Sequence, residues 1–144
     1  MNHKTRVFVN GCFDVLHYGH IYLLRYAYEL ACNEVVVAIN SDESIKRLKG
    51  NDRPINREFY RAETIASIRY VSRVIIFNED NPCEVLKKLC EEGNAPHFIV
   101  KGYEYIKKED QLPEIDIINQ YGIVLAFVPH IHQLSTSEIL SRAQ

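Results

Sequence analysis

The chain has 144 residues and a mass of 16.7 kDa, which is the size of one domain and too small for two full ones. Hydrophobic residues make up 47% and charged residues 25%, near globular averages, which excludes disorder and fibrous repeats. The 17 basic and 19 acidic side chains give a net charge of −2, too balanced for binding nucleic acid or anionic membranes. With neither a membrane-length apolar run nor a secretory signal in the sequence, we expect a cytoplasmic protein.

Strands and helices are predicted to alternate along the chain. In chain order the pattern predicts a strand at 6–10, a helix at 19–31, a strand at 34–39, helices at 41–48 and 57–70, a strand at 73–77, a helix at 82–92, a strand at 97–100, a helix at 113–121, a strand at 123–128 and a helix from about 135. Ser41 or Asp42 is expected to cap the second helix, and residues 101–112 are expected to be irregular.

This alternation predicts an α/β fold with one doubly wound, five-stranded parallel sheet and helices on both faces. Residues 1–144 are expected to form a single domain. Ligands of such sheets bind beyond the carboxyl ends of the strands, where the strand order switches. The segments that follow strands, residues 10–20, 40–53, 101–105 and 129–137, are therefore the candidates for a site.

The first of these segments, Asn-Gly-Cys-Phe-Asp-Val-Leu-His-Tyr-Gly-His at residues 10–20, carries two histidines at the predicted start of a helix. His17 and His20 are three residues apart and point the same way on a helical turn, and Gly19 between them allows a close approach to the backbone. Free amides at a helix start favour an anion. This segment therefore predicts a cradle for a polyphosphate, although two surface histidines at a helix start are the alternative.

The same residues resemble the signature of the cytidylyltransferase-like nucleotidyltransferases. Residues 133–140, Gln-Leu-Ser-Thr-Ser-Glu-Ile-Leu, are similar to that family's second signature, a Ser/Thr-rich helix start that meets the first signature at one ligand. Residues 37–42, 46–56 and 99–102 resemble the heptose-1-phosphate adenylyltransferase branch. Tyr103 and Glu104 depart from that branch, which tends to have glycine and aspartate there. His130 stands where the glycerol-3-phosphate branch has arginine.

The resemblance implies a Rossmann-like nucleotidyltransferase domain that transfers AMP from ATP to a sugar 1-phosphate of the heptose type. Mg²⁺ accompanies the triphosphate, pyrophosphate leaves, and the protein forms a homodimer. The implied catalytic residues are His17, His20 and Lys46; the nucleotide-binding residues are Asn10, Gly11, Cys12, Phe13, Asp14, Gly19, Lys101, Gly102, Ser135, Thr136 and Ser137; and the substrate-binding residues are Asp42, Lys49 and Arg53. Arg61 is expected to support the site.

Each assignment has an alternative. Lys46 and Lys49 would also suit a solvated helix face, and Ser135 a simple helix cap. Asp14 would also suit a residue that fixes its loop by accepting backbone hydrogen bonds. Lys101 with Gly102 would suit a plain turn. The pair His130 and His132 lacks cysteine or acidic partners, so no protein metal site is predicted. The alternative functions are a cytidylyltransferase that uses CTP and glycerol 3-phosphate, and a non-catalytic nucleotide-binding regulator.

Overall fold

A computed structural model describes residues 5–31, 34–129 and 136–143. Its five strands are β1 (Arg6–Gly11), β2 (Glu34–Asn40), β3 (Arg73–Phe77), β4 (Phe98–Lys101) and β5 (Val124–Phe127). All paired strands are parallel, in the order β3-β2-β1-β4-β5. The predicted fold class is therefore confirmed.

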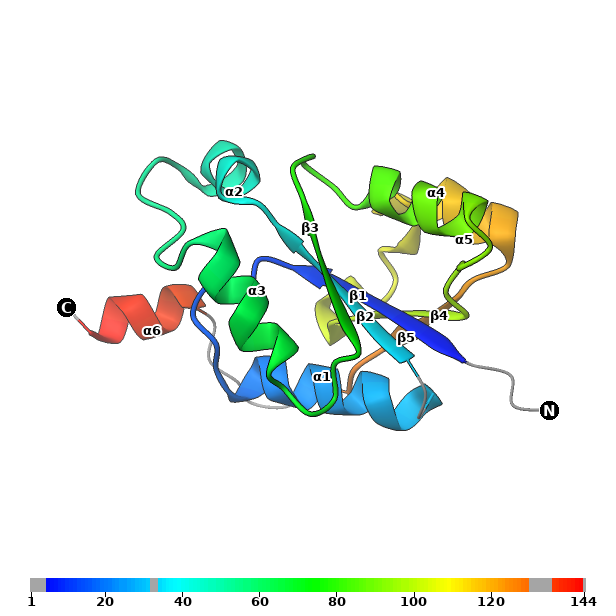
Figure 1. Cartoon of the computed structure of the whole chain (residues 1–144), viewed down its shortest axis with the longest axis horizontal. Coiled ribbons are helices and arrows are strands. Elements are labelled where there is room, and N and C mark those ends of the chain that lie inside the picture. The colour runs from blue at the N-terminus through cyan, green and yellow to red at the C-terminus, as the bar shows by residue number, and fades with distance from the viewer. Residues whose placement is uncertain (1–4, 32–33, 130–135, 144) are drawn as a thin grey trace.

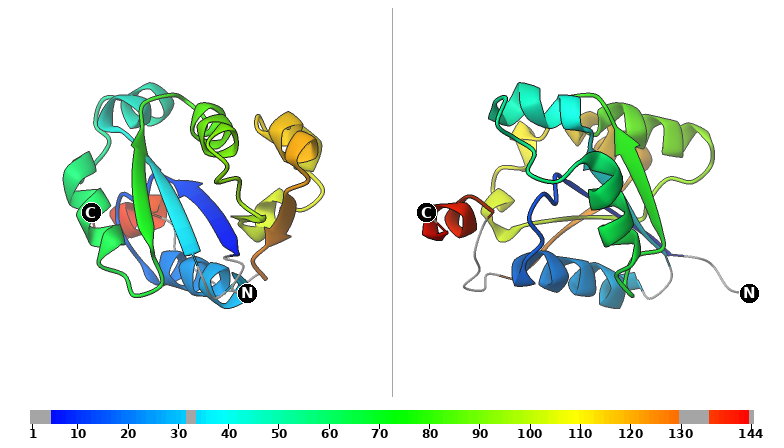
Figure 2. Two further views of the ribbon diagram at one scale, coloured as in Figure 1. Left: turned by 45° about the vertical axis from the view of Figure 1, so that its right-hand side comes forward. Right: turned by 60° about the vertical axis from the view of Figure 1, so that its left-hand side comes forward.

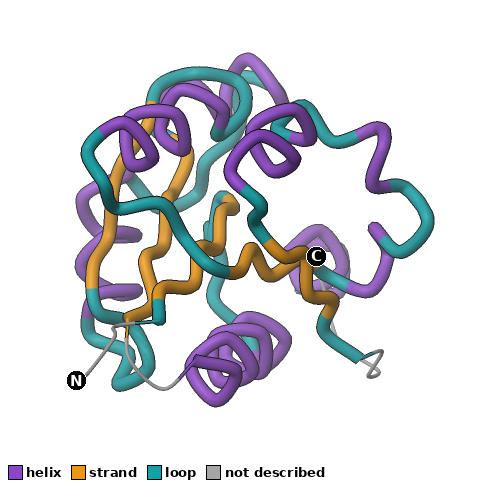
Figure 3. Tube along the Cα trace, turned by 90° about the vertical axis from the view of Figure 1, so that its right-hand side faces the viewer, coloured by secondary structure: helices purple, strands orange, loops and turns teal. Residues whose placement is uncertain are grey.

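Helices cover both faces of the sheet. The helices α1 (Tyr18–Ala31) and α3 (Glu58–Ala66) lie on one side, and α4 (Cys83–Glu91) and α5 (Ile115–Tyr121) on the other (Figure 1 and Figure 2). Side chains of a strand alternate between faces, so Val7 and Val9 join the core under α1 and α3, whereas Phe8 joins the core under α4 and α5. The strands consequently lie between two helical layers, as the end-on view in Figure 3 shows.

The central strands explain the apolar runs in the sequence. In β2, every residue after Glu34 is buried, because β1 and β3 flank the strand and helices cover both faces. The register pairs Val9 with Val37 and Gly11 with Ile39. The continuous run of apolar residues therefore predicts this strand correctly.

Local signals set most helix boundaries. The helix α2 (Asp42–Lys49) begins after Ser41, whose hydroxyl accepts a hydrogen bond from the Ser44 amide, as predicted for a cap. Gly122 ends α5 in a left-handed conformation, with φ of 63°.

The prediction for residues 57–70 was too long, because α3 ends at Ala66. The Ser67 hydroxyl donates to the Glu63 carbonyl, and tighter turns follow. These turns bring Ile68 and Val71 against the core under α1 and α3, so tertiary packing overrides the helical spacing of the apolar residues. Within the segment predicted to be irregular, residues 103–105 and 109–111 form short 3₁₀ turns.

The chain changes direction across the sheet at β1. The strand pairs with β2 on one side and with β4 on the other. The loops that follow β1 and β4 therefore diverge beyond the carboxyl ends of these two strands. The last helix, α6 (Thr136–Arg142), lies on the same side of the molecule as the loop between β1 and α1 (Figure 1). Among the described helices, we find none long and apolar enough to cross a membrane.

Candidate active site

Two stacked imidazoles mark the end of β1. The ring centroids of His17 and His20 lie 3.9 Å apart with the planes at 28°. The Gly19 amide donates to His17 Nδ1 at 3.1 Å, and the His17 amide donates to His20 Nδ1 at 3.2 Å. A ring nitrogen that accepts a backbone N–H carries no proton, so in the neutral ring the proton is assigned to Nε2. Both rings therefore offer an Nε2–H donor beside the start of α1.

The surroundings hold His20 in its neutral form. Burial, followed by the neighbouring His17 and the positive charge of Lys49, lowers the pKa of His20 to about 4. The Phe13 ring supplies part of that burial, with its centroid 5.0 Å from the His20 ring. A neutral His20 at pH 7 is a hydrogen-bond donor at Nε2 and adds no charge to the site.

The loop before these histidines has a strained backbone. Phe13 has φ of 48°, which non-glycine residues rarely adopt. A Cβ on Gly11 would lie 3.1 Å from the Phe13 ring, so a residue without a side chain lets the ring fold back over the end of β1. The glycine and Phe13 thus shape the wall of the site that His20 contacts.

Asp14 ties this loop to the loop after α2. Its carboxylate accepts hydrogen bonds from the Ile55 and Asn56 amides, each at 2.8 Å, and from Arg53 Nε at 3.2 Å. Burial opposes ionisation, but the hydrogen bonds from Asn56, Ile55 and Arg53 outweigh it and lower the pKa of Asp14. The Asp14 carboxylate therefore fixes the loop. This role is the alternative to direct nucleotide binding that the sequence left open.

Arg53 lies against Asp14, and one nitrogen of its guanidinium lacks a hydrogen-bond partner among the described residues. Its side chain is only 12% exposed, and Nη2 is buried without a hydrogen-bond partner among the described residues. A buried donor without an acceptor is costly. The guanidinium is thus suited to an anionic ligand.

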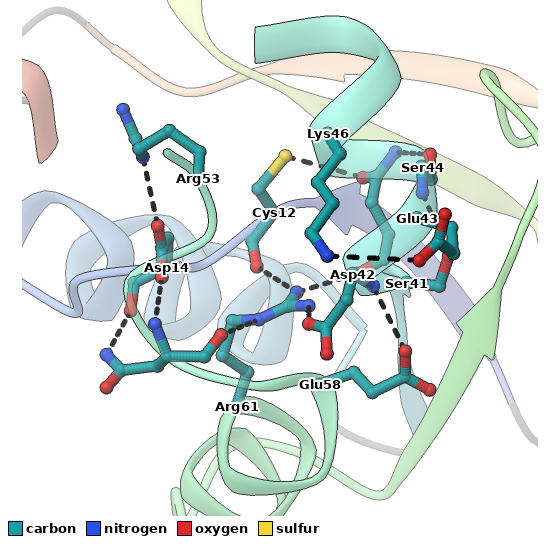
Figure 4. Close-up of polar contacts among 12 residues, drawn as sticks. Cys12, Asp14, Ser41, Asp42, Glu43, Ser44, Lys46, Arg53, Glu58 and Arg61 are labelled. Atoms are coloured by element: carbon teal, nitrogen blue, oxygen red, sulfur yellow. Dashed lines mark hydrogen bonds and ion pairs between the residues drawn. The ribbon is translucent and has the colours of Figure 1, made fainter. Parts of the chain in front are cut away.

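Arg61 on α3 connects the ends of β1 and β2. Its guanidinium donates to the carbonyls of Cys12 at 3.0 Å, Asn40 at 2.7 Å and Asn56 at 2.8 Å, and to Asp42 Oδ1 at 2.8 Å (Figure 4). The residue is 2% exposed. The expected support of the site by Arg61 therefore takes the form of a buried network that fixes three backbone segments.

The predicted residues of α2 divide between this network and the surface. Asp42 accepts from Arg61, and its amide donates to the Glu58 carboxylate. Lys46 Nζ lies 3.9 Å from Glu43 Oε1, and the Lys46 side chain is 45% exposed (Figure 4). Lys49 is exposed, yet its charge acts on both Cys12 and His20. Lys49 is thus an accessible cation whose charge reaches His20.

A pocket of about 260 Å³ brings the ends of β1 and β4 together. Its lining includes the predicted residues Asn10, Gly11, Cys12, Phe13, His20, Lys101 and Gly102, together with Leu23, Val100, Glu104 and Tyr105. A Cβ on Gly102 would meet only the carboxylate end of the exposed Glu104 side chain, which can move aside. A larger hollow of about 710 Å³ runs along β3 and α4, but it contains none of the predicted residues.

Sequence reasoning missed three polar side chains of this region, Glu104, Tyr105 and Glu114, and the lining residues Leu23 and Val100. Glu114 is 1% exposed and lies 2.9 Å from Lys101 Nζ. Burial of this carboxylate carries no sequence signal, because it depends on β4 and α5 meeting in space. The proximity of Tyr105 to the same ammonium, 5.7 Å from the ring centroid, has the same origin.

The second predicted motif is only partly within the structure. Ser135 lies outside the described residues, as do His130 and His132. Thr136 and Ser137 begin α6, which agrees with a helix start there, but their side chains are not described. Contact of the three hydroxyl residues with a nucleotide stays a prediction.

The described residues include no group of three or more His, Cys, Asp or Glu side chains that could hold a metal ion.

The class of protein is defined by a parallel sheet, a switch point between β1 and β4, and paired Nε2–H donors at the start of α1. This class is a Rossmann-like nucleotide-binding domain of nucleotidyltransferase type. The family model described as cytidylyltransferase-like matches residues 8–142. The chain belongs to the cytidylyltransferase-like family.

The chain is similar to curated and solved members of that group. It is 49% identical over 106 residues to the bifunctional protein HldE of Nitratiruptor sp., covering 74% of this chain and 22% of that protein. It is 39% identical over 138 residues to HldE of Gluconobacter oxydans, covering 96% and 27%. The chain thus spans about a quarter of the length of these relatives. A lipopolysaccharide core biosynthesis protein from Thermoplasma volcanium superimposes with a TM-score of 0.65 at 28% identity, covering 89% of this chain and 98% of that chain.

Proposed function

We propose that the chain transfers AMP from ATP to a sugar 1-phosphate of the heptose 1-phosphate type, releasing pyrophosphate and forming a nucleotide sugar. The observation that carries the proposal is the stacked pair His17 and His20, with two Nε2–H donors at a helix start beyond the carboxyl end of β1. The similarity to HldE proteins and to a lipopolysaccharide core biosynthesis protein supports a sugar-nucleotide product. The ATP preference rests on that similarity.

The distribution of charge supports one orientation of the nucleotide. In the pocket at β4, Glu114 offsets the charge of Lys101, His20 is neutral, and Glu104 adds a carboxylate. Three cations, Lys46, Lys49 and Arg53, lie on α2 and the loop that follows it, where Lys49 is exposed and Arg53 pairs with Asp14 but keeps Nη2 without a partner among the described residues. We therefore place the nucleoside in the pocket and the triphosphate between the histidines and α2, where opposite charges attract.

The reaction itself needs no base from the protein. An ionised oxygen of the acceptor phosphate attacks the α-phosphorus, a P–O bond forms, and the bond from the α-phosphorus to the bridging oxygen of pyrophosphate breaks. Protein groups then have to position two anions and stabilise charge on the equatorial oxygens. His17 and His20 donate from Nε2 to oxygens around the α-phosphate, and Lys46 reaches the same phosphates.

The acceptor is assigned to the side of Arg53. Its Nε is held by Asp14, while the buried Nη2 lacks a partner among the described residues, so an acceptor phosphate would supply the missing oxygen. Lys49 and Asp42 are assigned to the same substrate, with Asp42 fixed by Arg61. Mg²⁺ bound to the triphosphate supplies further charge neutralisation. Ser135, Thr136 and Ser137 are assigned to the β- and γ-phosphates, and we propose that residues 1–144 act as one domain within a homodimer.

No covalent enzyme intermediate is required. Cys12 is a nucleophilic side chain that lines the pocket, and burial raises the pKa of its thiol, against the opposing charge of Lys49. A protonated thiol is a poor nucleophile, and the substrate phosphate is already ionised. Direct transfer in one step follows.

The test is pyrophosphate release from ATP, CTP, GTP and UTP, each with heptose 1-phosphate and with glycerol 3-phosphate. ATP with heptose 1-phosphate is expected to give the highest kcat/KM, and each substrate alone is expected to release none. The double variant His17→Ala, His20→Ala, purified identically, controls for contaminating enzymes. Preference for CTP with glycerol 3-phosphate would reverse the assignment, and nucleotide binding without turnover on any pair would identify a regulator.

A further inference from the structure

A buried ion pair borders the pocket without having an assigned role. Glu114 directly precedes α5 and is 1% exposed, and Lys101 ends β4 with its side chain 10% exposed. Glu114 Oε1 and Lys101 Nζ are 2.9 Å apart. The same ammonium donates a hydrogen bond to Asn10 Oδ1 at 2.9 Å. Three residues from β1, β4 and the start of α5 thus form one polar chain.

Stability alone is a weak reason for this arrangement. Removing two charges from water costs about as much as their attraction returns, and apolar residues of similar volume often serve equally well. Glu114 also forms no aligned hydrogen bond through Oε1, despite its closeness to Lys101. What the pair does supply is a fixed position for the ammonium.

The fixed ammonium determines which way the Asn10 amide faces. A lysine ammonium has donors only, so the Asn10 oxygen must face it, and the NH₂ group is directed elsewhere. Asn10 and Lys101 both line the 260 Å³ pocket, whereas Glu114 does not. The Asn10 NH₂ is then the donor that a ligand in this pocket would meet, with the lysine charge already offset.

We propose that Glu114 is a positioning residue for the nucleoside: it holds Lys101, and Lys101 turns Asn10 so that the amide NH₂ donates to an acceptor atom of the nucleoside. The inference rests on the proposed function, because it requires a nucleotide in the pocket. It adds Glu114 to the residues that determine nucleotide affinity, although Glu114 is not among the residues that line the pocket.

A double-mutant cycle of Glu114→Gln and Asn10→Ala tests this route, with the Kd of ATP measured by calorimetry and unfolding followed in parallel. Loss of one hydrogen bond predicts about a tenfold higher Kd for Asn10→Ala. Glu114→Gln is expected to raise the Kd similarly, and the double variant no further, because both changes remove the same donor. Asp116→Asn, an exposed charge in the first turn of α5, is the matched control and should leave the Kd unchanged.

A second variant separates positioning from folding. Lys101→Met with Glu114→Gln removes both buried charges and is expected to recover the unfolding temperature lost in Glu114→Gln alone. We expect the Kd of ATP in this variant to stay about tenfold higher than that of the wild type, because the ammonium that orients Asn10 is then missing. Recovery of wild-type affinity together with stability would overturn the proposal, and so would an unchanged Kd in Asn10→Ala. Failure of the wild type to bind ATP would instead overturn the proposed function and this inference together.

Discussion

Replacing Arg61 by lysine tests the buried network that joins the ends of β1 and β2. The guanidinium makes four hydrogen bonds of 2.7 to 3.0 Å, three of them to backbone carbonyls. A lysine keeps the charge, but its compact ammonium cannot reproduce the planar fork and leaves at least two acceptors unpaired. Hydrogen bonds to charged groups contribute about 1.5 to 3 kcal/mol each, so the expected destabilisation is about 4 kcal/mol.

For a chain of this size that loss corresponds to a fall in Tm of about 10 to 15 °C, measurable by calorimetry. Because Arg61 fixes the Cys12 carbonyl and the Asp42 carboxylate, kcat/KM should also fall about tenfold at temperatures where the variant is folded. Arg25→Lys is the matched control, since Arg25 pairs with Glu29 on the exposed surface of α1, and the Tm of this variant should not change. A Tm for Arg61→Lys within about 2 °C of wild type would show that the Arg61 network does not stabilise the fold.

Three further outcomes follow from the site. In a ¹⁵N NMR experiment, His20 should titrate near pH 4 and should show the Nε2–H tautomer above that pH. An ordinary histidine pKa near 6.5 would contradict the burial of its ring. Asp14→Asn should lower Tm at pH 7, and the difference from wild type should shrink as the pH falls below about 4, because the lowered pKa stabilises the fold only while Asp14 is ionised. A chiral α-phosphorothioate substrate should react with inversion, and retention would implicate a protein nucleophile such as Cys12.

Local patterns were enough to predict the frame of the fold and the loop that carries the histidines. The apolar run of β2, the Ser41 cap and the Gly122 stop each act within a few residues, so the sequence contains them in full. The parallel sheet follows from the alternation of elements, and it directs attention to the segment that follows β1. The end of α3 was not predictable in this way, because Ile68 keeps helical spacing while packing into the core from a turn.

Contacts between distant segments were beyond local patterns. Arg61 finds its acceptors on three separate segments, and Glu114 meets Lys101 only because α5 packs beside the end of β4. Asp14 shows the same limit: a carboxylate next to a phosphate-binding motif suits a ligand contact and an internal anchor equally well until Ile55 and Asn56 are placed beside it. Polar burial of this kind is determined by tertiary structure.

The stacked histidines are expected to act on the transition state, and single-turnover pyrophosphate release by His17→Ala and His20→Ala measures that effect. With enzyme in excess over ATP and acceptor saturating, each variant is expected to release pyrophosphate on the order of 10²-fold more slowly than wild type. The Kd of ATP should change by less than about fivefold, since the donors act most strongly on charge that develops at the α-phosphate. Single-turnover rates near the wild-type value in both folded variants would show that the histidines do not stabilise the transition state.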